Sequence, residues 1–468
     1  MSDSLAELVA AEDVLLFVNA AVTATGQREF RSSAAEQRLS LAFLHEYVRV
    51  NYRPLYASCL ALDINDHNAA LIAEHLLRTP HEAGPHEGRL IAARLALLPP
   101  QRVYRLFGAL RAAKVNNRRT RAIMRDWLAA RPDLGLDAVK YRTGLKTAVR
   151  HLHLTPGAET GDFLFAPRRR ARYDHALLDA YRRAHHDQRA VYELPFTVAE
   201  GFAARHGVPR GVFLERIAPR MTRLERLRTQ RGPGVAADLS TMPLTRLALY
   251  VLALPFEERA ARRAELTGAL RAAARRTAGP QAGTWGRVAA VLDDSYSSSG
   301  SGVKRRRPLA VALGCHFLLE ALAESYRVHW TSGGTDPLLV RPYGPTPLGL
   351  RVLDALQAPG PAPDRLVIVS DGWDNAPPGL AGEVLRVWRS RLDPERRTAA
   401  VHLNPVYDAG GFDVRRLAPS VPTAGVRDAE DLPALVEIAQ FAEGRTGLAE
   451  LRAHLDRRVE LFLKEAGA

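Results

Sequence analysis

Cysteine is almost absent from this chain, since Cys59 and Cys315 are the only two among 468 residues. They form neither a CxxC pair nor a Cys/His spacing, so the sequence predicts no disulfide framework and no zinc site. No apolar run approaches the length of a membrane span, and the acidic start Met1 to Glu7 lacks the basic segment of a secretory signal. We therefore expect a cytoplasmic protein that does not associate with a membrane.

Common catalytic motifs are missing as well. The sequence contains no HExxH, no GxxxxGKS or GxxxxGKT, and no GxSxG. This excludes zinc proteases, P-loop NTPases and α/β-hydrolases at the level of their motifs. Nothing else in the chain argues for catalysis, so we expect a protein that is not an enzyme.

Positive charge is abundant and unevenly distributed. The formal net charge is +14. Residues 281 to 468 contain 22 Lys and Arg against 23 Asp and Glu, whereas residues 1 to 280 contain 43 against 28. All of the excess positive charge therefore lies in the N-terminal part, where such a field favours nucleic acid or another polyanion. A role in solubility is the alternative.

Oxygen-bearing side chains follow two short apolar runs in the C-terminal part. Val288 to Leu292 is suited to a buried parallel strand and leads into Asp293-Asp294-Ser295-Tyr296-Ser297; Leu366 to Val369 leads into Ser370-Asp371-Gly372. Ligands of open α/β sheets lie beyond the carboxyl ends of the strands. We therefore expect Asp293 and Asp371 to meet there, although 78 positions separate them.

Thr346, just before a predicted helix over Leu350 to Leu356, adds a further oxygen. The complete candidate set is Asp293, Ser295, Ser297, Thr346 and Asp371. A set of oxygen ligands without Cys or His favours Mg²⁺ or Mn²⁺ over zinc. In order and spacing, these residues resemble the metal-ion-dependent adhesion site of von Willebrand factor A domains, over about residues 283 to 440. The alternative is that Ser295 to Gly302 is only a flexible Ser- and Gly-containing loop.

Helical periodicity runs through residues 5 to 275, with breaks at Pro or Gly. Arg-bearing faces alternate with apolar stripes in several segments, such as Arg38 to Tyr52, Ala69 to Leu77, Gln101 to Ala113 and Thr120 to Ala130. Helices of this length and spacing predict stacked antiparallel pairs, that is, a HEAT-like α-solenoid.

Arginine clusters interrupt these predicted helices. They include Arg118 with Arg119, the run Arg168, Arg169, Arg170 and Arg172, and the series Arg216, Arg220 and Arg223. The last three are spaced i, i+4, i+7, which predicts one helical face. A solvated surface is the alternative for any single cluster. Lys304 to Arg307 also forms a basic run, for which we expect a solvated first helical turn, with an RNA contact as the alternative.

Three segments resemble the TROVE domain of the Ro ribonucleoprotein family. They are Ala122 to Trp127, then Ala138-Val-Lys140-Tyr141-Arg142, then Arg150-His-Leu-His153-Leu-Thr-Pro156. A later segment, Gly211 to Arg228 with Met221-Thr-Arg-Leu-Glu-Arg-Leu, resembles a later part of that domain. The chain order agrees, because in this family a ring of helical repeats precedes a von Willebrand A domain.

The resemblance implies a basic ring that holds single-stranded 3′ ends of misfolded noncoding RNA and binds Y-type RNA on its outer face. The family's Y-RNA contacts fall on Lys140 and His153, and Arg142 and Arg150 are neighbouring candidates. A core position is the alternative for His153. The loop between Lys140 and His153 is shorter than in the family.

Taken together, the sequence predicts a multidomain chain: a TROVE-like α-helical ring over 1–280, a doubly wound α/β von Willebrand A domain over 281–440, and a C-terminal helix over 441–468. We expect a monomeric noncatalytic RNA-binding protein that contains Mg²⁺ or Mn²⁺. Its A domain could contact an RNA-processing exoribonuclease or another protein. The alternative is a metal-dependent interaction scaffold, a partner of a MoxR-type ATPase without RNA function.

Overall fold

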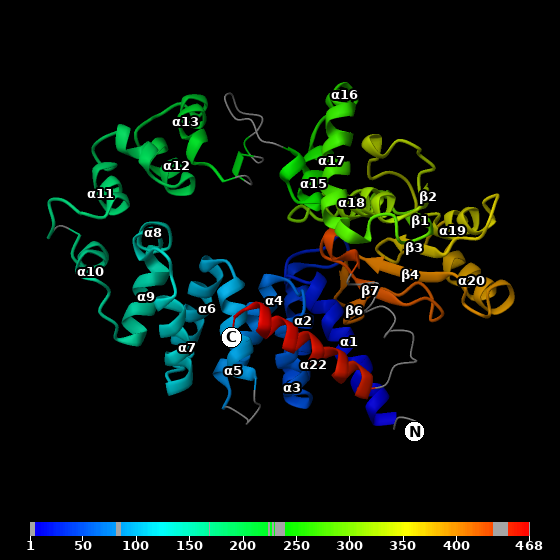
Figure 1. Cartoon of the computed structure of the whole chain (residues 1–468), viewed down its shortest axis with the longest axis horizontal. Coiled ribbons are helices and arrows are strands. Elements are labelled where there is room, and N and C mark those ends of the chain that lie inside the picture. The colour runs from blue at the N-terminus through cyan, green and yellow to red at the C-terminus, as the bar shows by residue number, and fades with distance from the viewer. Residues whose placement is uncertain are drawn as a thin grey trace. The chain divides into compact units, whose positions relative to one another are not determined.

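The computed structural model describes residues 5–80, 86–167, 169–222, 225–226, 229, 239–433 and 448–467. The chain divides into two compact units. The α/β unit comprises Met1–Asn68 and Leu239–Glu460, and the helical unit comprises Ala69–Asp238 and Leu461–Ala468. The ranges expected from the sequence are divided differently, because the first helices of the chain group with the sheet (Figure 1).

Short helices build the helical unit. Its elements are α4 (Asp66–Arg78, which begins in the α/β unit), α5 (Glu87–Leu97), α6 (Pro100–Ala112), α7 (Arg118–Ala129), α8 (Leu134–Lys140), α9 (Arg142–Leu152), α10 (Ala158–Phe165), α11 (Ala176–Arg183), α12 (Phe196–Arg205) and α13 (Arg210–Ile217). Each helix packs on others a few places away in the chain, as α5 does on α7 and α6 on α9. The predicted α-solenoid is therefore confirmed.

Local capping explains where several of these helices begin. The Asn117 side chain accepts a hydrogen bond from the Thr120 N–H at the start of α7, and Asp133 accepts one from the Leu136 N–H at the start of α8. Pro100 occupies the first turn of α6, where its missing N–H costs nothing.

The α/β unit contains a five-stranded parallel sheet of order β2-β1-β3-β4-β7. The strands are β1 (Arg287–Leu292), β2 (Ser325–Trp330), β3 (Arg365–Val369), β4 (Ala399–Asn404) and β7 (Thr423–Gly425); β5 (Tyr407–Asp408) and β6 (Asp413–Val414) form a separate antiparallel pair. The two predicted strands are confirmed as β1 and β3, and the doubly wound α/β fold is confirmed with them.

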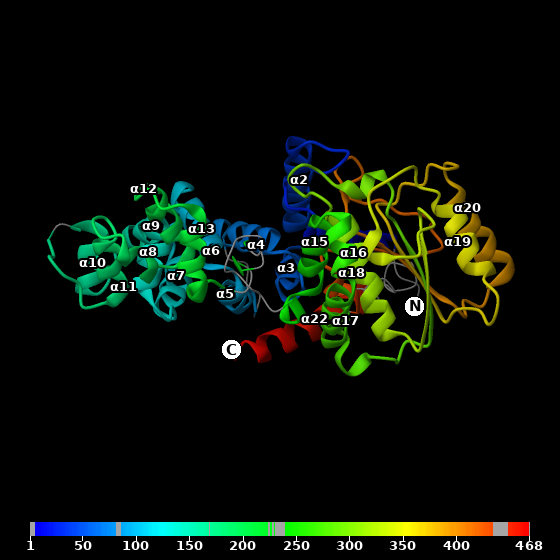
Figure 2. The ribbon, with the colours of Figure 1, turned by 90° about the horizontal axis from the view of Figure 1, so that it is seen from above.

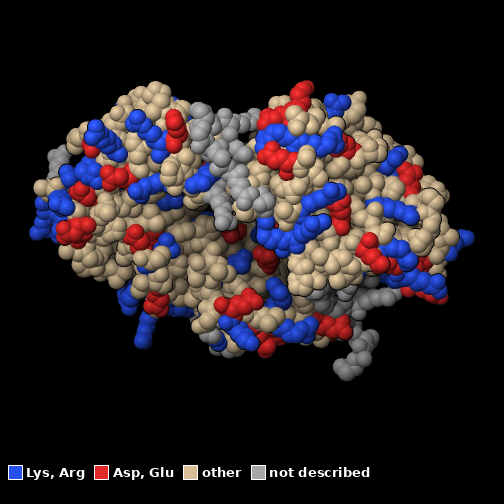
Figure 3. Space-filling view, turned by 45° about the horizontal axis from the view of Figure 1, so that its top comes forward, with Lys and Arg blue, Asp and Glu red and all other residues tan. Residues whose placement is uncertain are grey.

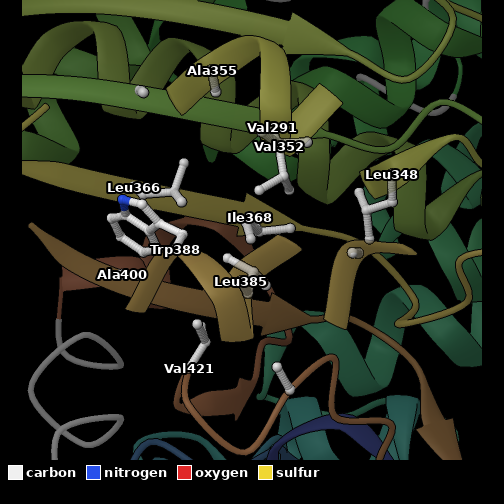
Figure 4. Packing of buried hydrophobic residues seen from close by; sticks show 13 residues of the cluster. Val291, Leu348, Val352, Ala355, Leu366, Ile368, Leu385, Trp388, Ala400 and Val421 are labelled. Atoms are coloured by element: carbon white, nitrogen blue, oxygen red, sulfur yellow. The ribbon is translucent and has the colours of Figure 1, made fainter. Parts of the chain in front are cut away.

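Helices cover both faces of this sheet (Figure 2). The connecting helices are α18 (Arg307–Leu322), α19 (Leu348–Gln357) and α20 (Leu380–Val387). On the face covered by α19 and α20, side chains including Val291, Ile368, Val352 and Leu385 form a buried apolar cluster (Figure 4). On the other face α18 lies against α15 (Leu244–Ala253) and α17 (Arg263–Ala278). The unit also contains α2 (Ala34–Asn51), α3 (Arg53–Ser58) and α16 (Phe256–Ala261).

Helix α1 (Leu5–Thr23) packs against β7, which is an edge strand of the parallel sheet, and against β6. The Asn19 side chain donates to Asp413 Oδ1 at 3.0 Å and accepts from the Gly425 N–H at 2.9 Å. This contact joins segments about 400 positions apart. Helix α22 (Leu448–Glu465) ends the described chain, in which no helix is both long and apolar enough to cross a bilayer.

Candidate metal and nucleic-acid sites

The sheet brings the first and last predicted metal ligands together. Leu292 of β1 and Val369 of β3 are paired in register, and the Asp293 N–H donates to the Val369 carbonyl at 2.9 Å. Asp293 directly follows β1, and Asp371 follows β3 by two residues. Because α18 and α19 leave this region toward opposite faces, the two carboxylates lie at the switch point of the sheet, where open α/β folds bind ligands.

The three hydroxyl residues complete a connected cluster. The Ser295 N–H donates to Asp293 Oδ1 at 2.8 Å, and Thr346 Oγ1 donates to Ser295 Oγ at 2.9 Å. Ser295 Oγ and Ser297 Oγ lie 3.3 Å apart, and Ser297 hydrogen-bonds to Asp371. All five residues are buried, with at most 6% of their surface exposed. The structure therefore places the complete predicted set at one point.

The electrostatics of this cluster favour a cation. Burial, and then the nearby charge of Asp371, raise the pKa of Asp293; burial also raises the pKa of Asp371. Two buried carboxylates of this kind are stabilised in their ionised form by a positive charge between them. The described residues contain no group of three or more His, Cys, Asp and Glu able to hold a metal. Two carboxylates with three hydroxyls fit a hard oxygen-preferring cation such as Mg²⁺ or Mn²⁺.

Further residues around the cluster were missed in the sequence. Thr331, directly after β2, donates to Asp293 Oδ1 at 3.1 Å and to Asp294 Oδ1 at 2.8 Å. Asp294 also accepts from the Ser332 N–H and hydroxyl, so it holds the loop after β2 instead of facing the cluster. A polar residue at the end of a strand was the available signal for Thr331.

Two arginines from distant segments flank the cluster. The guanidinium carbons of Arg31 and Arg415 lie 4.0 and 3.8 Å from the centre of the Trp373 ring, and the backbone N–H of Trp373 donates to Asp371 Oδ1. Both positive charges act to lower the pKa of Asp371. Nothing local in the sequence marks Arg31, because its position depends on how residues 24–33 pack.

The basic run Lys304 to Arg307 is used inside the α/β unit. Lys304 is buried in an ion pair with Glu29, Arg306 donates to the Leu252 carbonyl, and Arg307 donates to the Arg427 carbonyl. Arg306 and Arg307 remain partly exposed, but for Lys304 the expected solvated turn is wrong. The reason is that the preceding loop folds onto Glu29 and turns the side chains inward.

The candidate RNA-binding residues of α8 and α9 differ in whether their side chains are free to contact RNA. Arg150 and His153 are exposed, and Lys140 is partly exposed. His153 ends α9 in the left-handed conformation with φ 52°, so it is not a core histidine. Arg142, by contrast, donates to the Phe163 carbonyl at 2.8 Å and lies 4.7 Å from the Phe163 ring centre. Arg142 thus connects two helices of the solenoid.

The arginines of the other clusters are also divided between free and paired side chains. Arg118 and Arg172 are exposed and form no ion pair within the described ranges, whereas Arg119 pairs with Glu87 at 2.6 Å. Arg169 and Arg170 share Asp162, and only Arg170 is close, at 2.6 Å. Arg168 lies outside the described residues.

The predicted single helical face of Arg216, Arg220 and Arg223 is wrong for the part that is described. Helix α13 ends at Ile217, and Arg220 lies in a following 3₁₀ turn, where it donates to the Glu193 carbonyl. Pro219 has no N–H to continue the helical ladder, which explains the change. Arg223 lies outside the described residues.

Charges of both signs are mixed on the surface shown in Figure 3. Lys and Arg side chains lie among Asp and Glu in both units on this face. The net charge of a region does not show which of its cations are free, so the individual unpaired cations identify binding candidates better than the total charge does.

The fold and the oxygen cluster define a helical-repeat protein joined to an A-domain-like α/β unit. Among solved structures, the crystal structure of the Ro protein (RSR) of Deinococcus radiodurans is similar, with a TM-score of 0.57 and 15% identity over 93% of this chain and 100% of that chain. No family model and no curated protein sequence matches this chain. The resemblance to Ro proteins is thus confirmed at the level of the fold.

Proposed function

We propose that this chain is a noncatalytic RNA-binding protein that binds noncoding RNA through its helical unit. The observation that carries the proposal is the Ro-like fold over 93% of the chain. Unpaired cations on that fold support it. The RNA would be of Y type, or would present a single-stranded end.

The surface around α9 offers both charge and an aromatic ring. Arg150 and Lys146 lie 5.2 and 5.4 Å from the ring centre of Phe165, which is 40% exposed. Neither Arg150 nor Lys140 forms an ion pair within the described parts of the chain. Cations beside an exposed ring suit a single strand, because phosphates neutralise the charge and bases stack on the ring.

Charge reversal tests this surface. The double variant Lys140→Glu, Arg150→Glu is expected to weaken binding of a single-stranded oligoribonucleotide at least about 10-fold, and to lower the log-log salt slope by about 0.7 per lost phosphate contact. The matched control is Arg391→Glu, Arg397→Glu, which makes the same charge change on exposed arginines of the α/β unit. Fluorescence anisotropy across several salt concentrations gives both quantities. An equal loss of RNA affinity in both double variants would show that binding depends only on net charge, and would reject this surface.

We also propose that the oxygen cluster binds Mg²⁺ or Mn²⁺. Asp293, Ser295, Ser297, Thr346 and Asp371 would hold the ion directly or through water. The support is the convergence of five buried oxygen-bearing side chains, two of which are carboxylates whose pKa values are raised. The ion would supply charge balance and an open coordination position for an acidic group.

Calorimetry with Mn²⁺ tests the metal site. Asp293→Ala is expected to abolish the binding isotherm, while Asp354→Ala, which removes an exposed carboxylate of the same unit, leaves it unchanged. Retention of Mn²⁺ binding by Asp293→Ala would disprove the assignment.

A protein partner of the α/β unit is the second candidate function, and the Arg31–Trp373–Arg415 stack favours it. Positive side chains beside a metal suit an acidic group of a partner. Crosslinked partners are expected to disappear on chelation and in Asp293→Ala, while RNA binding persists. A set of crosslinked partners that is insensitive to both treatments would count against this function.

A further inference from the structure

A cavity of about 490 Å³ opens between α6 and the start of α9 in the helical unit. Its volume falls within the range of sites for small organic groups. The cavity is lined by Gln101, Tyr104, Arg105, Gly108, Val139, Lys140, Tyr141, Arg142, Thr143, Gly144 and Thr147. None of these residues is acidic and three are basic, which favours an anionic over a cationic occupant.

The aromatic walls of the cavity are held in place from behind. Tyr104 is buried and donates its hydroxyl to Asp137 Oδ2 at 2.8 Å, and the Trp127 ring meets it edge-on at 5.2 Å. A Cβ at Gly144 would lie 2.5 Å from Tyr104 Cβ, so glycine is needed for α9 to approach α6 this closely. The Tyr141 ring lies 5.8 Å from the Tyr104 ring, tilted by 37°. A planar group entering the cavity would therefore meet preorganised rings.

Gly108 leaves open space beside α6 that no helix contact needs. A Cβ at this position would meet no atom within 4 Å, although Gly108 lies inside α6. Glycine in a helix interior costs about 1 kcal/mol relative to alanine. The open space at Gly108 therefore belongs to the cavity and not to a helix contact.

Two cations of the lining remain available. Arg105 is exposed, Lys140 is partly exposed, and neither forms an ion pair within the ranges that the structure describes. Lys140 Nζ lies 5.9 Å from the Tyr141 ring centre, so one charge adjoins an aromatic wall. Arg142, the third basic residue, already donates to the Phe163 carbonyl. Gln101, Thr143 and Thr147 add neutral hydrogen-bonding groups.

We propose that this cavity binds one unpaired nucleotide of the RNA, with its base against Tyr141, whose ring the buried Tyr104 contacts, and its phosphate on Arg105 and Lys140. The inference rests on the proposed RNA function and deepens it. It states that the helical unit binds a base in a defined place, in addition to contacting phosphates along a surface. Stacking tolerates every base, so the neutral groups would supply only a modest sequence preference.

Filling the cavity tests the proposal. The probe is a single-stranded oligoribonucleotide with 2-aminopurine placed at each position in turn, together with oligonucleotides abasic at the same positions. In the wild type, one position is expected to show quenched fluorescence, and its abasic form is expected to bind about 10-fold more weakly. Gly108→Leu should remove both effects. The control Gly201→Leu, at an exposed position of α12 where a Cβ also meets nothing within 4 Å, should remove neither.

A second pair of variants guards against misfolding. Tyr141→Leu is expected to lose the preference for a base, and Tyr141→Phe, which restores a ring, to retain more of it; thermal melts confirm folding. If Gly108→Leu binds like the wild type, or if abasic oligonucleotides bind equally at every position, the cavity proposal fails while RNA binding stands. If the wild type binds no RNA, the proposed function fails and the cavity proposal fails with it.

Discussion

At the scale of single residues, Asp293 and Asp371 connect metal binding to protonation. The pKa of each is raised in the folded protein, so without a cation the folded state holds protons that the unfolded state releases. The free energy of unfolding should then fall as pH rises above the ordinary carboxyl value of 3.8. A bound divalent cation opposes this loss because it requires ionised carboxylates.

Metal binding should therefore depend on pH. Mn²⁺ affinity is expected to increase from pH 5 to pH 8, because protons and metal compete for the same oxygens. Mg²⁺ is expected to raise the free energy of unfolding more at pH 8 than at pH 5. Calorimetry and urea unfolding with and without EDTA measure the two effects. An affinity that does not change with pH would show that the carboxylates are already ionised without metal.

His402 has the opposite dependence. It is buried in β4 between Ser370 and Thr423, and burial lowers its pKa from 6.5 to about 4. The unfolded state therefore takes up a proton first, so this contribution to stability is complete above pH 6.5 and is lost as pH falls toward 4. Between pH 7.5 and pH 5, the free energy of unfolding of His402→Gln should fall by about 2 kcal/mol less than that of the wild type. His186→Gln, at an exposed site, should follow the wild type in urea unfolding in EDTA.

At the scale of elements, close helix contacts are made by particular glycines. Helix α19 carries Thr346 just before its start and packs on α20. A Cβ at Gly349 would lie 2.6 Å from the Ala381 nitrogen and 2.6 Å from Leu380 Cγ. The position of Thr346 in the oxygen cluster therefore depends on a helix contact that only glycine permits.

Alanine substitution tests this dependence. Gly349→Ala is expected to cost about 1–3 kcal/mol through overpacking, and to weaken Mn²⁺ binding by shifting Thr346. Gly268→Ala in α17, where a Cβ meets nothing within 4 Å, should instead stabilise by up to about 1 kcal/mol. Urea unfolding distinguishes them. A neutral Gly349→Ala would mean that α19 and α20 can separate without cost.

At the scale of the whole molecule, the α/β unit is built from two segments of the chain, one before and one after residues 69–238. Residues 1–68 pack with residues 239–460, through contacts such as Asn19 with Asp413 and Lys304 with Glu29. An A-domain range of 281–440 leaves out α1, α15 and α17, which cover buried parts of this unit.

Fragments test this organisation. A fragment of residues 239–460 is expected to be markedly less stable than the same fragment fused to residues 1–68, because the absence of Glu29 removes the ion-pair partner of buried Lys304 and the absence of Asn19 removes one hydrogen-bond partner of buried Asp413. Circular dichroism melts measure the difference. Equal melting temperatures of the two fragments, or full stability of residues 281–440 alone, would show that the N-terminal helices do not stabilise the sheet.

The amino-acid sequence alone determined the features that arise from local pattern. The apolar runs of β1 and β3, the helical periodicity and the spacing of Asp293, Ser295 and Ser297 act over a few residues, so they can be interpreted without a fold. Asp371 could be added because parallel strands end at one edge, and Thr346 because its place before a predicted helix fits the order and spacing of the adhesion site.

Only the tertiary structure decided which side chains are free. It directs Lys304 and Arg142 to internal partners and places Arg31 beside Trp373, whereas the break of the Arg216 and Arg220 series at Pro219 has a local cause that the sequence already contains. The physical reason is that packing joins a charge or ring to a partner elsewhere in the chain, at a separation of 21 positions for Arg142 with Phe163 and 275 for Lys304 with Glu29. No periodicity in the sequence records such a contact.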